Sequence, residues 1–443
     1  MPDSEQDQPK VESPALRVLV ERGFFEAASD LAAIDAAMQA GMVTFYNGYD
    51  PTARSLHAGS LLTIMAARHL QKHGHKPLML LGGATARVGD PSGRSETRKM
   101  LGEDQIASNL AAMRAQFGRF LEFDTGAAND AVMLDNNDWL APIHYIEFLR
   151  DIGRHFTVNR MIAAKTYRDR LESEQPLSFL EFNYQLLQAY DFLHLYREMG
   201  CTLQVGGADQ WGNMISGVEL IRRVKAGNGE DPDKQDKQDK PDTAHCLTYP
   251  LLVMADGAKM GKTAAGAVWL DAELFSPFDY YQYWINCHDR DVGMLLRLFT
   301  ELPLDHIAAL VAGEGSALKS AKAELAFEAT KMLHGEDEAI RARKGAEQAF
   351  GSGEDWSALP LAEIPVGEIP GGALELLDIV VHDAVKGFKS KREARERIKA
   401  GAVRINGEVV SEPGEKYDVA ACGDDGLRVQ IGRKRRLRVK LAP

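Results

Sequence analysis

Short apolar runs alternate with helical patterns over about the first 270 residues, and no other feature limits the possible fold as strongly. Several of these runs end where Gly, Asp or Asn appears. Strands that alternate with helices pair in parallel, so we predict an α/β fold built on a Rossmann-like parallel sheet. Ligands bind beyond the carboxyl ends of the strands in such sheets. The expected strands are residues 42–50, 76–83, 131–139 and 202–209, and the expected helices are residues 55–74, residues 179–200 and a helix from about residue 210.

The chain of 443 residues is too long for one compact core. A charged stretch without apolar residues, 227–243, cannot bury a core and is expected to be a disordered surface insertion, most simply a solvated loop without function. The predicted segments are a disordered leader (1–14), an α/β domain (15–270), a helical domain (271–350), a linker rich in Gly, Pro and acidic residues (351–372), and a small α+β domain (373–443).

Charge is divided unevenly along the chain. The residues from Lys386 onward hold 16 Lys and Arg against 8 Asp and Glu, a charge of +8, which leaves −20 of the total of −12 for the rest. An acidic body with a basic module suggests that one part of the chain meets nucleic acid. The four cysteines form no Cys-x-x-Cys pair and no cluster with His, which favours reduced thiols in a cytoplasmic protein without bound zinc. No apolar run reaches the roughly 18 residues that a membrane span needs.

Two short elements are suited to handling phosphates. The sequence HAGS, residues 57–60, stands at the expected start of a helix, where free N–H groups and the helix dipole favour an anion. His57 and Thr52 can donate to a phosphate, and Gly59 lets a flat base approach the backbone. The sequence KMGKT, residues 259–263, follows a turn signal and predicts a mobile cationic loop that can close over a triphosphate. Taken singly, a helix that merely begins with His and a solvated basic loop are equally simple interpretations.

A polar stripe crosses the helix expected at 179–200, which is apolar almost all round and so should be buried. Tyr184, Gln188 and Asp191 fall at i, i+4 and i+7 on one face. Buried polar groups need partners, which come either from a satisfied core network or from a ligand. A tyrosine molecule fits the second case: Tyr184 and Gln188 offer acceptors to its ammonium, while Asp191 and Tyr46 can accept from and donate to its phenol.

The HAGS and KMGKT elements resemble the paired signatures of class I aminoacyl-tRNA synthetases, whose usual forms are His-Ile-Gly-His and Lys-Met-Ser-Lys-Ser. Ser60 stands where a second His is usual and Ala58 stands for Ile. Ser60 can hydrogen-bond a ribose or a ring nitrogen, but it cannot stack or carry charge. From about residue 16 to the end, the chain is similar to bacterial-type tyrosyl-tRNA synthetases, and the segments that carry the similarity are YNGYDPTARSLHAG, GGATARVGDPSGR, FNYQLLQAYDF, GGADQWGN and ADGAKMGKT.

This resemblance implies a homodimeric tyrosine–tRNA ligase with L-tyrosine, ATP carried with Mg²⁺, and tRNA(Tyr) as substrates. It also implies that 15–270 is the catalytic domain, 271–350 a helical anticodon-side domain and 373–443 a small RNA-binding domain. Arg94 and Arg98 match positions that assist pyrophosphate, although arginines on a polar loop are also simply solvated. The implied contacts are Tyr46 and Asp191 with the tyrosine hydroxyl; Tyr184, Gln188 and Asp90 with the ammonium, with Gln204 and Gln210 nearby; Gly48, Asp50, Gly59, Ser60, Gly207 and Asp209 with ATP and the adenylate; and Thr52, His57, Lys259, Lys262 and Thr263 with the phosphates.

The C-terminal segment resembles the small RNA-binding fold first known from a ribosomal protein of the small subunit. A basic helix and a basic strand would form its RNA-binding face, which a phosphate backbone would meet by shape and charge. The competing interpretation is a solvated helix, because Glu393 and Glu396 are interleaved with the basic residues. The predicted RNA-binding residues are Lys391, Arg392, Arg395, Lys399, Arg433 and Arg435.

Two other functions remain open at this point. A non-catalytic RNA-binding scaffold would not need both signatures and the polar stripe together. Another nucleotidyl transferase with a His-x-Gly motif would not explain the C-terminal module. The full set of motifs therefore favours the ligase.

Overall fold

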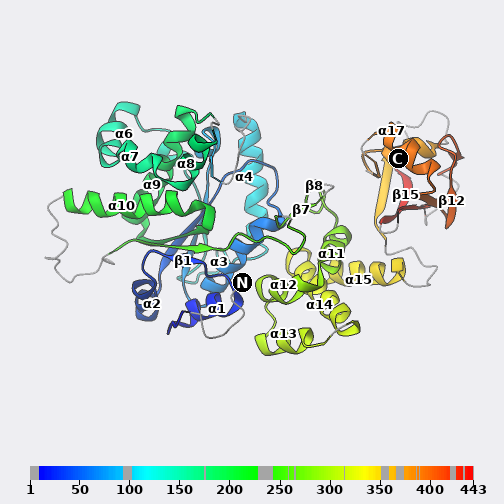
Figure 1. The fold of residues 1–443 in the computed structure, drawn as a ribbon, viewed down its shortest axis with the longest axis horizontal. Helices are drawn as coiled ribbons and strands as arrows, with labels where there is room; N and C mark the ends of the chain where they lie inside the picture. Colours follow the sequence, from blue (N-terminus) through cyan, green and yellow to red (C-terminus); the bar gives the residue numbers. More distant parts are fainter. Residues whose placement is uncertain are drawn as a thin grey trace. The chain divides into compact units, whose positions relative to one another are not determined.

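The chain is described by a computed structural model (Figure 1), which covers residues 9–92, 102–173, 176–227, 243–257, 259–263, 266–313, 315–350, 359–365, 374–385, 387–388, 390–419, 426–432 and 435–442. It divides into two compact units. The first holds residues 1–274 and 287–321, and the second holds residues 275–286 and 322–443.

A six-stranded sheet forms the centre of the first unit, and all its strands run parallel except the short edge strand β1. Its order is β1 (Ala27–Ala28), β6 (His245–Tyr249), β5 (Cys201–Gly207), β2 (Thr44–Tyr49), β3 (Lys76–Leu81) and β4 (Val132–Asp135). The strands β3 and β5 are buried over almost their whole length, as expected for a sheet covered on both faces. The predicted parallel α/β sheet is confirmed.

Chain order reverses between β2 and β5, because β3 and β4 follow on one side of β2 while β5 and β6 lie on the other. On one face, α9 (Phe179–Met199) and α10 (Trp211–Gly227) pack over the sheet in a core that joins Tyr46 and Leu78 to Leu186 and Leu220. The helix α9 begins with a capping box between Ser178 and Glu181, and Gly200 ends it. The other helices of this unit up to residue 227 are α1 (Pro14–Arg22), α2 (Leu31–Ala40), α3 (Leu61–Lys72), α4 (Glu103–Phe117), α5 (Asn137–Leu140), α6 (Tyr145–Asp151), α7 (Val158–Ile162) and α8 (Lys165–Glu172).

Two further helices complete the first unit, α12 (Val292–Phe299) and α13 (Leu304–Val311). The loop that joins them is fixed by charges from α1 and α3. Arg68 makes two hydrogen bonds to Glu301, at 2.8 and 3.1 Å, and Lys72 Nζ lies 2.6 Å from the same carboxylate. Arg22 donates to the carbonyl oxygens of this segment, at residues 297, 300 and 302.

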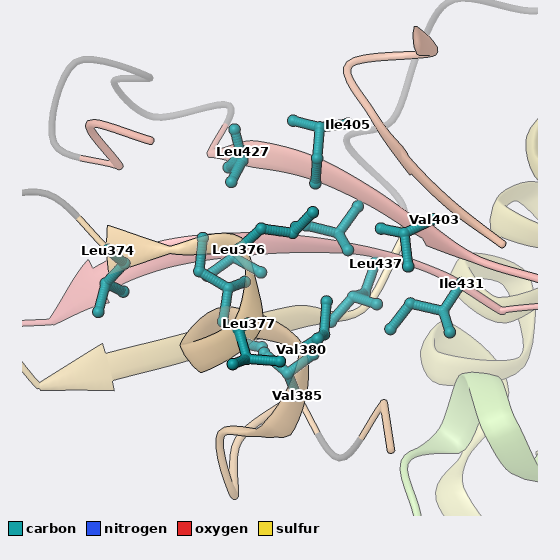
Figure 2. Close-up of a cluster of buried hydrophobic side chains, with 14 of the residues drawn as sticks. Leu374, Leu376, Leu377, Val380, Val385, Val403, Ile405, Leu427, Ile431 and Leu437 are labelled. Atoms are coloured by element: carbon teal, nitrogen blue, oxygen red, sulfur yellow. The ribbon is translucent and has the colours of Figure 1, made fainter. Parts of the chain in front are cut away.

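The second unit contains α11 (Pro277–Ile285), most of α14 (Ser316–His334), α15 (Glu336–Phe350) and a small α+β module. The module has a five-stranded sheet in the order β12 (Glu408–Val410), β11 (Val403–Ile405), β14 (Leu427–Ile431), β15 (Arg435–Ala442) and β9 (Leu361–Pro365). Against it pack α16 (Leu376–Val381) and α17 (Lys391–Lys399), and a second small sheet pairs β10 (Leu374–Glu375) with β13 (Lys416–Tyr417). Figure 2 shows their shared apolar core, which includes Leu377, Val380, Val403 and Leu437.

The hairpin predicted at Asn406-Gly407 is present between β11 and β12. Both turn residues have positive φ, 51° and 91°, as the two-residue turn requires. The segment predicted as a linker differs, because it contains β9, which pairs in parallel with β15. Within β9, buried Ala362 and Ile364 alternate with exposed neighbours. The strand therefore depends on pairing with β15, far along the chain, to bury one of its faces.

The predicted leader also differs from the structure. The backbone N–H groups of Glu12 and Ser13 donate to Asp35 at 2.9 and 2.8 Å, and α1 begins at Pro14. Residues 12–14 are therefore part of the folded chain, and residues 1–8 lie outside the described residues. Of the predicted insertion, residues 228–242 lie outside the part of the chain that the structure describes.

The Glu301 cluster gives the first prediction. Burial alone would raise the pKa of Glu301, but hydrogen bonds from Arg68 and Lys72 outweigh it and lower this pKa to about 2. A pKa depressed below its unfolded value means that the stabilisation is present above about pH 4.5 and is lost as the pH falls toward 2. Glu301→Gln should lower the free energy of unfolding by about 1–2 kcal/mol at pH 7. That difference from the unmodified protein should shrink below about pH 4.5 in urea titrations.

The control for this measurement is Glu336→Gln. Glu336 is exposed and lies 3.6 Å from Lys331, so its loss should change stability little. An equal effect of Glu301→Gln at about pH 3 and about pH 7 would contradict an ionic origin.

Candidate active site

Carboxylates gather where the central strands end. Asp50 follows β2 and accepts hydrogen bonds from Thr85 Oγ1 at 2.9 Å and Tyr184 Oη at 3.1 Å. Gly82 and Gly83 follow β3, and a Cβ on them would lie 2.2 Å from Asp50 Oδ1 and 2.3 Å from Asp135 Oδ1 respectively. Only glycine fits at these two positions while the carboxylates keep their places. The sequence interpretation treats these glycines simply as the end of a strand, and it misses Thr85.

Asp191, on α9, is only 3% exposed and accepts hydrogen bonds from Asn136 Nδ2 at 3.0 Å and Trp139 Nε1 at 2.8 Å. Burial raises the pKa of this carboxyl to about 7, against the lowering effect of the two donors, and the charges of Asp50 and Asp135 add to the rise. The sequence interpretation misses both donors, because it predicts one strand over residues 131–139. The strand β4 ends at Asp135, and the polar residues 136–138 directly after it are the available signal.

Three buried side-chain oxygens on the strands of this sheet have no hydrogen-bond partner among the described residues: Tyr46 Oη on β2, Gln204 Oε1 on β5 and Tyr249 Oη on β6. Tyr46 is 1% exposed and Gln204 is 3% exposed, and they are register partners on β2 and β5. Burial raises the pKa of the Tyr46 phenol well above its usual range, and the charge of Asp191 raises it further. Tyr46 is therefore a hydrogen-bond donor close to Asp191. Unsatisfied buried polar groups are costly and point to a ligand that supplies their partners.

A second polar network follows β5. Gln210 Nε2 donates to Asp90 Oδ2 at 2.8 Å, and Asn213 Nδ2 donates to Gln210 Oε1 at 3.2 Å. Burial raises the pKa of Asp209, the charge of Asp90 adds to this, and Lys259 opposes it. The structure thus brings together the predicted residues Asp90, Asp209, Gln210 and Lys259. Asn213, whose hydrogen bond holds the Gln210 side chain, is not among the residues predicted from the sequence.

The two signature elements touch each other through glycine backbones. A Cβ on Gly261, where φ is +79°, would lie 2.5 Å from Gly59 N, and a Cβ on Gly59 would lie 3.0 Å from the Met260 carbonyl oxygen. Ala58 N donates to Val268 O at 2.8 Å, and Val268 N donates to Gly261 O at 2.9 Å. The contact between two elements about 200 residues apart in sequence follows from these bonds and from the absence of side chains at the glycines.

The local structure at HAGS differs from the predicted helix start. A 3₁₀ turn, η2 (Ala58–Ser60), precedes α3, which begins at Leu61 rather than at residue 55. Thr52 is exposed in the segment after β2, and Gln188 is half-buried one turn beyond Tyr184. Lys262 and Thr263 form β7, paired with β8 (Gly266–Ala267).

Glycine has different roles at the other two predicted positions. A Cβ at Gly48 would meet nothing within 4 Å, so the strand is open to a ligand there. A Cβ at Gly207 would lie 2.7 Å from Asp209 Oδ1, so this glycine makes room for a neighbouring side chain. Arg94 and Arg98 lie outside the described residues.

In the module, Lys391, Arg392, Arg395 and Lys399 are all exposed on α17. Lys391 pairs with Asp378 at 2.6 Å, and Arg392 lies 3.5 Å from Glu396. Arg435 differs from the others, because it donates to the carbonyl oxygen of Val385 at 2.6 Å and so stabilises the module itself. Arg433 lies outside the described residues.

Comparison with known proteins agrees with this geometry. Residues 38–351 match the family described as tRNA synthetases class I (W and Y), and residues 376–420 match the S4 domain. The tyrosine–tRNA ligase of Caulobacter vibrioides (strain NA1000 / CB15N) is 46% identical over 97% of this chain and 98% of its own length. That of Zymomonas mobilis is 46% identical over 95% and 97%. The solved C-terminally truncated mitochondrial tyrosyl-tRNA synthetase of Aspergillus nidulans is 30% identical, with a TM-score of 0.67 over 76% of this chain and 95% of that chain.

The parallel sheet, the joined signatures and the S4 domain define a class I aminoacyl-tRNA synthetase of the tryptophan and tyrosine family. Within that family, identity of this level over nearly the whole chain shows that the protein belongs to the tyrosine–tRNA ligases.

The glycine contact gives the second prediction. Gly261→Ala should detach the lysine-containing loop from the HAGS turn, because the new Cβ would meet Gly59 N at 2.5 Å. Trypsin should then cleave at Lys259 and Lys262 several-fold faster than in the unmodified protein. Gly74→Ala is the matched control, since Gly74 also has positive φ, 89°, but a Cβ there would meet nothing within 4 Å. Both variants should lose about 1 kcal/mol of stability from backbone strain. Equal cleavage rates in the two variants would contradict the contact.

Proposed function

We propose that the chain activates L-tyrosine with Mg·ATP to give tyrosyl-adenylate and pyrophosphate, and then transfers the tyrosyl group to the 3′ end of tRNA(Tyr). The observation that carries the proposal is the buried Tyr46 Oη, unpartnered among the described residues and close to the carboxylate of Asp191. Its register partner Gln204 also has a buried oxygen, Oε1, without a partner among these residues. Membership of the tyrosine–tRNA ligase family supports the same reaction.

Amino-acid selection follows from the chemistry of the side chains around Asp191. Asp191, held by Asn136 and Trp139, accepts the hydrogen bond of the substrate phenol, and Tyr46 donates to the phenol oxygen. Tyr184, Gln188 and Asp90 hold the ammonium. Phenylalanine would leave Asp191 and Tyr46 buried without a partner from the ligand, which is the basis of strong discrimination. Tyrosyl-tRNA synthetases as a class are the established example of such selection against phenylalanine.

The activation step needs positioning and charge stabilisation. The tyrosine carboxylate is itself the nucleophile and attacks the α-phosphate, and pyrophosphate leaves, so no general base is required. Lys259 and Lys262 neutralise charge that develops on the phosphates, and His57 and Thr52 donate hydrogen bonds to them. Mg²⁺ arrives with ATP as part of the substrate. Asp50, Asp209, Gly48 and Gly207 line the adenylate, with Gly59 and Ser60 beside the nucleotide. Thr263, Arg94 and Arg98 assist the departing pyrophosphate.

We propose further that the protein acts as a cytoplasmic homodimer. Large exposed hydrophobic side chains are concentrated in residues 145–180, and Ile146 and Phe179 are 73% and 69% exposed. Apolar surface of this kind is typical of an interaction face. Analytical ultracentrifugation tests the dimer directly, and a monomer at micromolar concentration would contradict it.

Within the described residues, no helix has the length and apolar character needed to cross a bilayer.

The third prediction tests amino-acid selection. Tyr46→Phe removes the donor but keeps the ring that packs against Phe192 at a centroid distance of 5.3 Å. Tyrosine-dependent ATP–pyrophosphate exchange should fall about tenfold or more in kcat/KM, while phenylalanine-dependent exchange should change little. An equal loss for both amino acids would remove Tyr46 from the recognition of the hydroxyl, and no tyrosine-dependent exchange by the unmodified protein would refute the proposed function.

The fourth prediction assigns tRNA binding to the module. Replacing Lys391, Arg395 and Lys399 together by Glu should weaken tRNA binding and reduce the slope of log affinity against log salt by about 2–3. Tyrosine-dependent exchange on the same variant serves as the control and should stay unchanged. Unaltered tRNA charging at physiological salt would show that α17 is not the tRNA contact.

A further inference from the structure

The lysine-containing loop begins as a small hairpin, whose described residues are 252–257 and 259–260. Gly257 N donates to Met254 O at 2.8 Å across its turn, and Met260 N donates to Leu252 O at 3.2 Å at its base. An antiparallel bridge between Val253 and Lys259 joins the two arms. Lys259 therefore stands on the returning arm, and its direction depends on how the hairpin is held.

Asp291 holds the turn of this hairpin. Ala255 N donates to both carboxylate oxygens of Asp291, at 3.2 and 3.1 Å. Ala255 is exposed, whereas Asp291 is only 6% exposed. Asp291 occupies the position before the first residue of α12, where an Asp usually accepts a hydrogen bond from its own helix, but its side chain makes no such bond. Its carboxylate is directed to the hairpin instead.

The far end of α12 is tied to the helix that follows the other signature. Glu301, just after α12, binds Arg68 and Lys72 in the last two turns of α3. The helix α12 therefore links the C-terminal end of α3 to the turn of the hairpin, with one carboxylate at each end. A shift of α12 would move both elements.

We propose that Asp291 is a positioning residue for Lys259. It fixes the turn of the hairpin that carries Lys259, whose charge acts on Asp209, and α12 joins that turn to α3. This inference rests on the proposed function only for its kinetic consequence. In the activation step, a hairpin already held in place would bring Lys259 to the triphosphate without a slow rearrangement of the loop. Loss of the contact between Asp291 and Ala255 should therefore slow adenylate formation and leave tyrosine binding intact.

The experiment compares Asp291→Ala with Asp291→Asn and with Asp35→Ala. Single-turnover formation of tyrosyl-adenylate should slow about 10-fold to 100-fold in Asp291→Ala, the range expected for one lost hydrogen bond to a charged group. The tyrosine Kd should stay within about twofold. Asp291→Asn keeps one acceptor oxygen and should recover part of the rate.

Asp35→Ala is the matched control, because Asp35 is also buried and also accepts two bonds from backbone N–H groups, those of Glu12 and Ser13. It should lower the melting temperature without slowing adenylate formation. Asp291→Ala with the unmodified rate, or a rate loss equal to that of Asp35→Ala, would overturn the proposal.

Hydrogen exchange gives a readout that does not depend on activity. Peptides covering residues 252–260 should exchange fastest in Asp291→Ala, less fast in Asp291→Asn, and at the unmodified rate in Asp35→Ala. Unchanged exchange in both Asp291 variants would overturn the anchor even if the protein had no activity. Absence of tyrosine-dependent pyrophosphate exchange in the unmodified protein, with faster hydrogen exchange in the variants, would instead refute the proposed function and leave the anchor standing.

Discussion

Parallel pairing of β2 with β5 is the constraint on which the first unit depends. Because chain order reverses between these strands, the segments that leave their carboxyl ends diverge and leave the ends of both strands accessible. Asp50 directly follows β2, and Asp209 lies two residues after the end of β5. Tyr46 and Gln204 are register partners on these two strands. The helices α9 and α10 then cover the sheet, and the polar residues that complete the site come from segments distant in sequence.

The candidate site keeps polar groups in a buried environment that disfavours them. Asp191 has two donors yet a pKa of about 7, because burial and two neighbouring carboxylates oppose its charge. Tyr46 and Gln204 keep polar atoms buried without partners among the described residues. Such groups lower stability in the free protein and become favourable only when a ligand of the right chemistry satisfies them. The specificity proposed for a hydroxyl-bearing substrate and reduced stability of the free protein would thus have the same origin.

Where the signal is local, the sequence predicts which element is present, although not always where it begins or ends. The strands, the polar stripe on α9 and the Asn406-Gly407 turn all depend on residues within a few positions of one another. Contacts between distant segments are not predictable in the same way. Asn136 and Trp139 can be connected to Asp191 only through the order of the strands, because nothing in their own neighbourhood points to α9.

The same limit applies to the lysine-containing loop and to the C-terminal module. Gly261 can be connected to Gly59 only through the three-dimensional contact of the two signatures. From its neighbours, Asp291 is an ordinary helix cap, and nothing local shows that it serves another segment. The strand β9 escapes prediction because Gly, Pro and acidic residues around it obscure the alternation of Ala362 and Ile364.

That strand has a consequence for how the module folds. The hairpins β11–β12 and β14–β15 pair residues that are close in sequence, whereas Leu361 of β9 pairs with Arg438 of β15. Closing such a long segment carries a higher entropic cost and slows its formation, so β9 should join the sheet last. Until it does, β15 presents an open edge and β9 an uncovered row of apolar side chains. The interval before their pairing is therefore the stage at which this module is most exposed to association with other unfinished chains.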